Sequence, residues 1–205
     1  MLQMHNTNTL NRIPILRDSM YRDRAQQFSK RLKWAVSVDE NGHEIDQYDN
    51  NQSSYLIASN NDGQHMGSLR INTADRNCML VEHFAEEFPS VADYDSTVCE
   101  ITRFCLSPSL EARHSTLLSV SLMRTLFLNC LNNGSVNRIV GLCYRPIVNV
   151  YNRAGLSPCS ISSGRRDSQL ILAEWRVKPE KFVNIILAKP NMVKKTETPP
   201  QLVSA

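Results

Sequence analysis

The sequence predicts an α/β (α+β) domain in which helices flank a twisted, mixed β-sheet as a three-layer sandwich. Of the 205 residues, 41% are hydrophobic, which is enough for one sizeable core. Strand-like and helix-like stretches alternate after residue 98, as they do in mixed sheets. We find no internal repeat or second-domain boundary, so we expect a single domain over 1–189 and a disordered tail over 190–205, which is rich in Pro, Thr and Lys.

The first part of the chain is expected to hold one helix, one long loop and one hairpin. Residues 17–34 place apolar side chains at steps of four with charges between them, which is typical of an amphipathic helix. A short strand at 36–38 is followed by the polar, acidic stretch 39–53, and long loops in compact domains are often functional. The runs 55–58 and 66–71 flank an Asn/Asp/Gly turn and are predicted to form a hairpin.

The remainder of the chain is expected to alternate between helices and strands. Residues 115–132 give the clearest helix, because apolar residues recur every four positions and Asn133-Gly134 supplies a stop. The apolar run 139–143 is typical of a strand buried on both faces. The other expected elements are a short helix at 79–92, strands at 98–106 and 170–177, and helices at 145–154 and 179–188.

Composition excludes several classes of function. The formal net charge is only +3 and no run of five like charges occurs, so we expect neither a nucleic-acid partner nor a membrane partner. The N-terminal residues lack the pattern of a secretion signal, and no apolar stretch approaches the roughly 18–20 residues of a membrane span, so we expect a soluble cytoplasmic protein. Dinucleotide and P-loop motifs are absent.

Cysteine and histidine spacing gives no sign of a metal site. The six cysteines contain no C-x-x-C pair, and we expect them to be reduced residues of the core. The five histidines show no spacing typical of ligands, so that no metal site is expected. No Ser-His-Asp or Cys-His arrangement can be argued from the spacing either.

Charged residues stand where burial is expected, and these are the candidates for chemistry. Two aspartates lie in the loop 39–53, and one arginine and a Glu/Arg pair lie on predicted strands. A buried ion cluster costs desolvation and seldom adds net stability, so its presence favours function. A structural ion-pair network, or ordinary solvated charge, is the alternative. The five residues are Asp46, Asp49, Arg70, Glu100 and Arg103.

These residues carry a resemblance to a known family. The segments RAQQFSKRLKW, EIDQYD, MGSLRINT and CEITRF contain, in order, eight charged and aromatic residues of the acyl-homoserine-lactone synthase (autoinducer synthase) signature. The resemblance extends over about residues 20–185 and implies a GNAT-like fold. The stretch LEARHST lacks the glycine-rich turn with which most GNAT enzymes bind coenzyme A. The eight residues are Arg24, Phe28, Trp34, Asp46, Asp49, Arg70, Glu100 and Arg103.

The resemblance implies that an acyl thioester acylates the amine of S-adenosylmethionine, which then closes to a lactone and releases methylthioadenosine. S-adenosylmethionine is then a substrate, and no cofactor is expected. The implied catalytic residues are Glu100, as the base, with Arg103, Asp46, Asp49 and Arg70, the arginines being partly structural. The implied S-adenosylmethionine-binding residues are Arg24, Phe28, Trp34 and Phe104.

An acyl pocket is expected under the long helix at 115–132. Thr102, Met123, Phe127 and Leu142 are candidates, although a plain core role is the stronger interpretation for the last three. Gly141 stands where some relatives have a threonine that accompanies 3-oxo acyl chains, so an acyl group without this oxygen is favoured.

The donor is expected to be acyl carrier protein or acyl-CoA. Arg145 and Arg153 either meet the acidic carrier or are simply solvated. We expect a monomer or weak dimer. Two other functions stay open: a GNAT-type acyl-CoA N-acyltransferase, and a paralogue that binds ligand without turnover. Release of methylthioadenosine separates these possibilities, because only lactone formation produces it.

Overall fold

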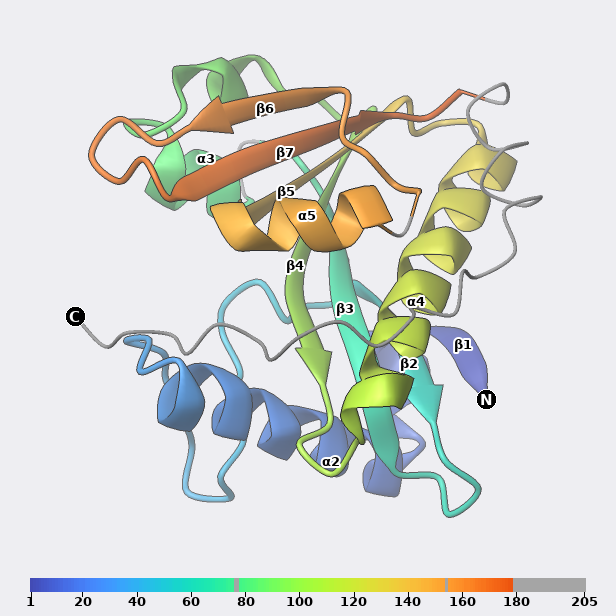
Figure 1. The fold of residues 1–205 in the computed structure, drawn as a ribbon. Coiled ribbons are helices and arrows are strands. Elements are labelled where there is room, and N and C mark those ends of the chain that lie inside the picture. The colour runs from blue at the N-terminus through green and yellow to red at the C-terminus, as the bar shows by residue number, and fades with distance from the viewer. Residues whose placement is uncertain (76–77, 154, 179–205) are drawn as a thin grey trace.

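The computed structural model describes residues 1–75, 78–153 and 155–178, which form one seven-stranded mixed sheet with helices on both faces (Figure 1). The strands, in their order across the sheet, are β1 (Leu2–Asn6), β2 (Ser54–Ser59), β3 (His65–Thr73), β4 (Val98–Leu106), β5 (Arg138–Tyr144), β7 (Leu170–Arg176) and β6 (Ser160–Ser163). The helices are α1 (Thr7–Asn11), α2 (Pro14–Arg24), the π-helix η1 (Ala25–Arg31), α3 (Met79–Phe84), the 3₁₀-helix η2 (Pro89–Asp93), α4 (Ala112–Asn133) and α5 (Arg145–Arg153).

The sheet is antiparallel except at its centre. β4 and β5 are parallel, as the crossover through α4 requires, and they pair only between Val98–Ile101 and Arg138–Gly141. Beyond that point the two strands diverge (Figure 1). The antiparallel pairs β1–β2, β2–β3 and β3–β4 form one half of the sheet, and β5–β7 and β6–β7 form the other.

Three layers result from the alternation of side chains along the strands. Leu56 of β2 packs in the main core, which α4 and α5 cover, whereas Tyr55 and Ile57 point to the other face and pack with α1 and α2. In the other half of the sheet, Val140 and Leu172 pack with α3 and η2. The expected sandwich of a mixed sheet between helices is therefore confirmed.

Most elements expected from periodicity are present, and the differences lie at the N-terminal helix and at the sheet edges. The helix expected at 17–34 ends as an α-helix at Arg24 and continues as a π-helix, in which the Leu32 N–H donates to the Gln27 carbonyl at 3.0 Å. The expected strand at 36–38 is reduced to a single bridge between Val38 and Glu44. The polar segments LQMHN, TNTLN and SISS form β1, α1 and β6, which were not expected.

The expectation for the cysteines is only partly correct, and that for the C-terminal residues is not tested. Four of the six thiols are buried, but Cys159 is exposed and was wrongly placed in the core. The helix expected at 179–188 and the tail at 190–205 lie outside the described residues. Within the described part of the chain, no helix combines the length and apolarity needed to cross a bilayer.

Candidate active site

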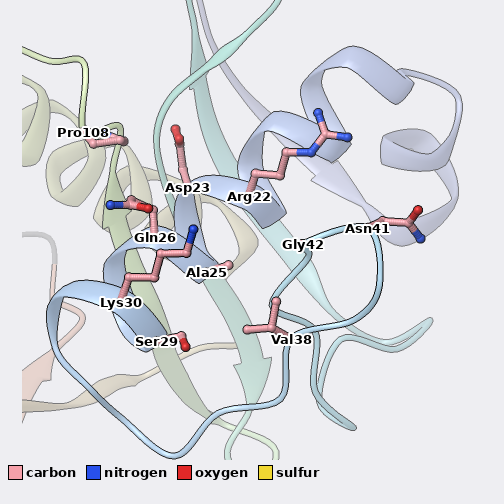
Figure 2. A pocket seen from close by; sticks show the side chains of 10 residues that line it. All are labelled: Arg22, Asp23, Ala25, Gln26, Ser29, Lys30, Val38, Asn41, Gly42 and Pro108. Atoms are coloured by element: carbon pink, nitrogen blue, oxygen red, sulfur yellow. The ribbon is translucent and has the colours of Figure 1, made fainter.

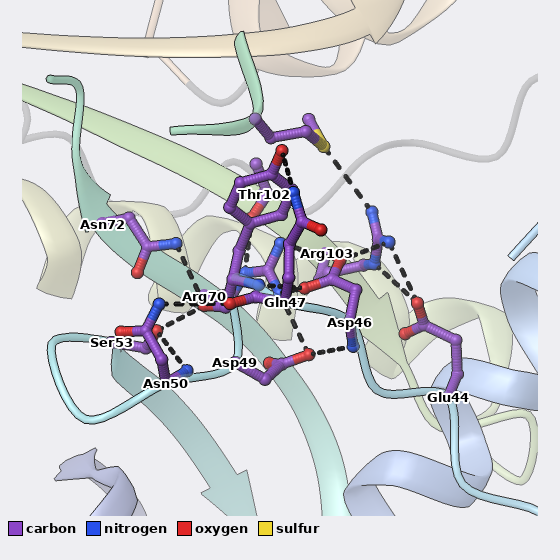
Figure 3. A network of polar contacts seen from close by, with 12 residues as sticks. Glu44, Asp46, Gln47, Asp49, Asn50, Ser53, Arg70, Asn72, Thr102 and Arg103 are labelled. Atoms are coloured by element: carbon purple, nitrogen blue, oxygen red, sulfur yellow. Dashed lines mark hydrogen bonds and ion pairs between the residues drawn. The ribbon is translucent and has the colours of Figure 1, made fainter. Parts of the chain in front are cut away.

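Six charged side chains from four parts of the chain form one network beside the sheet, and Figure 3 shows all of them except Arg24. Three cations come from the end of α2 and from β3 and β4, and three carboxylates come from the loop between η1 and β2. Their formal charges cancel. The residues are Arg24, Arg70, Arg103, Glu44, Asp46 and Asp49.

Arg24 holds two of the carboxylates. Its Nε donates to Glu44 at 2.7 Å, and its two terminal nitrogens donate to the two oxygens of Asp49, each at 2.8 Å. Burial lowers the pKa of Arg24, but the Asp49 and Glu44 charges outweigh burial and leave the pKa above its usual value. Arg24 is therefore a permanent, fully occupied cation.

Arg70 is occupied in the same way. Its Nε donates to the Thr102 hydroxyl at 3.0 Å, its terminal nitrogens donate to Asp46, and one of them lies 3.0 Å from Asp49. The Tyr48 ring covers it, with the guanidinium carbon 5.6 Å from the ring centroid.

Arg103 reaches the network because β4 bulges at this position. The pairing steps from Arg70–Thr102 to Ser68–Cys105, so that Arg103 and Phe104 together oppose a single residue of β3. Arg103 has a φ of +52°, and its side chain donates to Glu44 at 3.0 Å and to Asp46 at 2.7 Å.

The same bulge places Phe104 on the opposite face of the sheet. Its side chain packs against the main core below α4, not beside Arg103. Phe104 and Arg103 therefore point to different faces of the sheet, and the expected contact of Phe104 with S-adenosylmethionine stays a prediction.

Only two members of the network have appreciable exposure. The Asp46 side chain is 20% exposed and that of Arg103 is 10% exposed, whereas the other four are at 1% or less. The accessible part of the site is therefore one anion and one cation, whose nearest oxygen and nitrogen are 2.7 Å apart.

An aromatic pair borders this ion pair. Phe28 of the π-helix stacks on Trp34, with ring centroids 5.1 Å apart and ring planes inclined by 17°. The Arg103 guanidinium carbon lies 5.4 Å from the Phe28 centroid. Phe28 is buried, while Trp34 is 39% exposed. The rings thus join the network to a surface on which a ligand can stack.

Glu100 lies near the network but forms no ion pair with it within the described residues. One carboxylate oxygen accepts the Leu80 N–H at 2.7 Å, and the other is buried without a hydrogen-bond partner. Burial raises the pKa of Glu100, although the Leu80 hydrogen bond and the Arg70 charge oppose this. A buried carboxylate with a raised pKa and a free oxygen is suited to taking up a proton.

Three residues that sequence reasoning missed complete the site. Glu44 bridges Arg24 and Arg103, and the Tyr55 hydroxyl donates to Asp49 at 2.9 Å. The Tyr48 hydroxyl donates to Glu82 of α3 and so links the acidic loop to that helix. Glu44 stands two residues before Asp46 in the same acidic segment, so the sequence itself made it a candidate for the site. Nothing in the sequence pointed to the two tyrosines.

The side chains expected in an acyl pocket do not lie on one surface. Met123 and Phe127 are buried in the main core, and Phe127 packs edge-on against Trp175 with centroids 6.1 Å apart. Leu142 instead packs in the cluster around α3 on the opposite face, so its place beside Met123 and Phe127 is corrected.

The other two candidates have local structural roles. Thr102 accepts the Arg70 hydrogen bond and faces the charged network. Gly141 lies where β4 and β5 diverge, and a Cβ atom there would approach Ile101 Cγ1 to 2.8 Å. Among the described residues, no group of three or more His, Cys, Asp or Glu side chains is arranged to hold a metal ion.

Comparison with known proteins identifies the family. Residues 7–181 match the family model described as autoinducer synthase. The chain is 34% identical over 164 residues to the acyl-homoserine-lactone synthase of Rhizobium etli, covering 78% of this chain and 76% of that protein. The chain belongs to the autoinducer synthase family. This family catalyses acyl transfer in acyl-homoserine-lactone synthesis, and such synthesis is the activity of this chain.

Other autoinducer synthases agree in sequence and fold. The acyl-homoserine-lactone synthase of Pseudomonas amygdali pv. tabaci is 28% identical over 152 residues, covering 73% of this chain and 66% of that protein. The CoA-dependent synthase BjaI, solved with SAM and isopentyl-CoA, superposes with a TM-score of 0.73 at 18% identity, covering 98% and 95% of the two chains. An acyl-CoA N-acyltransferase from Pseudomonas aeruginosa superposes with a TM-score of 0.55 at 14% identity, covering 85% and 98%. These structures share the GNAT-like fold.

Proposed function

We propose that Asp46 and Arg103 bind the amino-acid part of S-adenosylmethionine, with the ammonium on Asp46 and the carboxylate on Arg103. The observation that carries this proposal is their exposure, since the other charges of the network are enclosed. Phe28 and Trp34 then offer aromatic faces to the positively charged sulfonium. Arg24, Arg70 and Asp49 act by holding the loop that carries Asp46.

The first chemical step is substitution at the acyl thioester. The amine attacks the carbonyl carbon, a C–N bond forms, the C–S bond breaks and the thiol leaves. The ammonium must first lose a proton, which we assign to Glu100, directly or through water, because its free oxygen and raised pKa suit a base. The ladder is irregular at the Arg103 bulge, and we assign stabilisation of the oxyanion to backbone N–H groups at this position.

The second step closes the ring. A carboxylate oxygen of the acylated substrate attacks the carbon of the amino-acid side chain that is bonded to the sulfonium sulfur. A C–O bond forms, and the bond between that carbon and the sulfur breaks. Methylthioadenosine leaves as a neutral molecule, and the product is an N-acyl-homoserine lactone. No cofactor enters either step, which remains an expectation.

The acyl donor is a thioester of coenzyme A or of acyl carrier protein, handled in the cytoplasm where these thioesters are made. BjaI, which shares the fold, is described as a CoA-dependent synthase, and this supports coenzyme A as the carrier of the acyl group. The mild positive charge of the chain supports an acidic carrier. We expect the enzyme to act as a monomer or weak dimer. We also expect residues 1–189 to form its single domain.

The test is to incubate the purified enzyme with S-adenosylmethionine and either acyl-CoA or acyl carrier protein, and to measure lactone and methylthioadenosine by mass spectrometry. Both products should appear in equal amounts. An acylated amine without methylthioadenosine would instead identify a general N-acyltransferase, and ligand binding without product would identify a non-catalytic paralogue.

Glu100→Gln should reduce turnover by about 10²–10⁴-fold, because the amide cannot accept the proton. Its shape and its bond to the Leu80 N–H are retained, so the melting temperature should change little. Glu111→Gln, an exposed change at the start of α4, is the matched control. Full turnover by folded Glu100→Gln would remove Glu100 from the role of base.

A further inference from the structure

A second polar cluster lies under α2, apart from the charged network. The imidazole of His65, at the start of β3, is fully buried. Its Nδ1 lies 2.7 Å from the Asp23 carboxylate, and its Nε2 lies 2.9 Å from the Ser68 hydroxyl. A carboxylate only accepts hydrogen bonds, so Nδ1–H donates to Asp23, while the Ser68 hydroxyl, which can donate or accept, is bonded to Nε2. One helical turn before Asp23, the Ser19 hydroxyl accepts the His65 backbone N–H at 3.0 Å.

The order Asp23, His65, Ser68 is that of a hydrolytic triad, but the nucleophile has no access to a substrate. Ser68 is 2% exposed. The pocket of about 480 Å³ on the outer side of α2 is bordered by Asp23 and by the loop at Pro108, and neither His65 nor Ser68 lines it (Figure 2). The cluster therefore works as a tie between helix and strand.

This tie acts on the part of α2 that carries the substrate site. Ser19 and Asp23 are four residues apart and therefore share one face of the helix. Arg24 follows Asp23 directly and holds both Glu44 and Asp49, and Phe28 lies one turn further along. A rotation or shift of α2 would move both groups relative to the acidic loop.

We propose that His65 is a positioning residue for the S-adenosylmethionine site: by joining Asp23 to Ser68 it sets α2 on the sheet so that Arg24 and Phe28 meet the acidic loop. This proposal rests on the proposed function for its effect on the substrate. The tie itself is a property of the fold. Of the two imidazole bonds, that to Asp23 matters more, because it alone crosses from strand to helix.

Two substitutions separate the two bonds. His65→Asn places an amide nitrogen where Nδ1 stands and keeps the bond to Asp23. His65→Gln places one near Nε2, keeps the bond to Ser68 and leaves the buried side of Asp23 without its donor. His114→Gln, on the exposed start of α4, is the control.

In His65→Gln the KM for S-adenosylmethionine should rise about tenfold, while kcat and the KM for the acyl donor stay within about threefold. His65→Asn should restore the KM to within about threefold of the unchanged protein, and Ser68→Ala should leave turnover within the same range. Equal KM values in His65→Gln and His65→Asn would overturn the proposal, as would loss of turnover in folded Ser68→Ala.

Native-state hydrogen exchange tests the tie without turnover. Amides of α2 and the π-helix should exchange about tenfold faster in His65→Gln than in His65→Asn, and equal rates in the two variants would overturn the positioning role. If the unchanged protein makes no lactone, the proposed function fails, whereas the exchange rates still decide whether His65 sets the position of α2.

Discussion

Arg24 shows at the scale of one residue how a fully buried charge is accommodated in this fold. All three of its donor nitrogens are used on Glu44 and Asp49, and its side chain is enclosed. A planar guanidinium meets two carboxylates with fixed geometry, which the single ammonium of lysine cannot reproduce. Arginine is thus required at this position for geometry as well as for charge.

We predict that Arg24→Lys lowers the free energy of unfolding by about 3 kcal/mol, because one buried carboxylate loses its bidentate partner. Arg17→Lys, on the same helix and in a partly exposed pair with Asp18, should change it by less than about 0.5 kcal/mol. Urea unfolding of both variants at pH 7 measures the difference. Equal stabilities would mean that lysine satisfies the same carboxylates.

The signature residues were predictable from sequence, whereas their exact roles were not. Charges on otherwise apolar strands pointed to Arg70 and Arg103, and the structure joins both to Asp46. The face to which Phe104 points could not be predicted, because a bulge changes the facing of the side chains after it and no residue of the segment indicates a bulge. An arginine whose backbone has a positive φ, as Arg103 has, is rare, and the hydrophobic pattern of a strand does not predict one.

At the scale of secondary structure, the close approach of β4 and β5 at their last paired position depends on Gly141. Backbone hydrogen bonds set the spacing of paired strands, and at this spacing a Cβ atom on residue 141 would meet Ile101 Cγ1 at 2.8 Å and the Ile101 carbonyl oxygen at 3.4 Å. Glycine therefore permits the close approach at the last paired position before the strands separate.

We predict that Gly141→Ala lowers the free energy of unfolding by about 1–3 kcal/mol through overpacking. Combining it with Ile101→Ala should give a favourable coupling energy of at least about 0.5 kcal/mol, because the second change removes the atoms that clash. A double-mutant cycle in urea measures this. Strict additivity would show that β5 moves away freely and that the contact carries no strain.

Elements with strong periodicity were located correctly, and those without it were missed. β4 and α4 matched their apolar patterns to within a few residues. β1 and β6 are edge strands with polar composition, and edge strands need little apolar alternation because one side stays open. The π-helix was read as an α-helix since both carry apolar residues four apart, and only the carbonyl accepting each N–H tells them apart.

At the scale of the whole molecule, Asp49 links stability to pH. Burial alone raises the pKa of this carboxyl group, but the Arg24 guanidinium, helped by Arg70, outweighs burial and lowers the pKa well below 3.8. The folded state therefore holds this proton less tightly than the unfolded state. The resulting stabilisation is complete above about pH 5 and is lost as the pH falls from 3.8 towards the folded pKa.

We predict that Asp49→Asn is less stable than the unchanged protein by about 3–5 kcal/mol at pH 7, and that this gap narrows by about 1.4 kcal/mol per pH unit below pH 4. Urea unfolding at pH 7, 4 and 3 measures the gap. Asp62→Asn, in the exposed turn between β2 and β3, should differ by less than about 0.5 kcal/mol at pH 7. A gap that stays constant with pH would show that Asp49 is not an ionised partner of Arg24.

The residues of the charged network come from α2, from the loop between η1 and β2, from β3 and from β4. No two of these segments alone contain all six charged residues. A chain in which only some of these segments have folded is therefore expected to have no activity, rather than a lower activity. Output of the signal molecule should follow the fraction of fully folded enzyme, so that warming a culture towards the melting temperature would end signalling abruptly and cooling would restore it together with the fold.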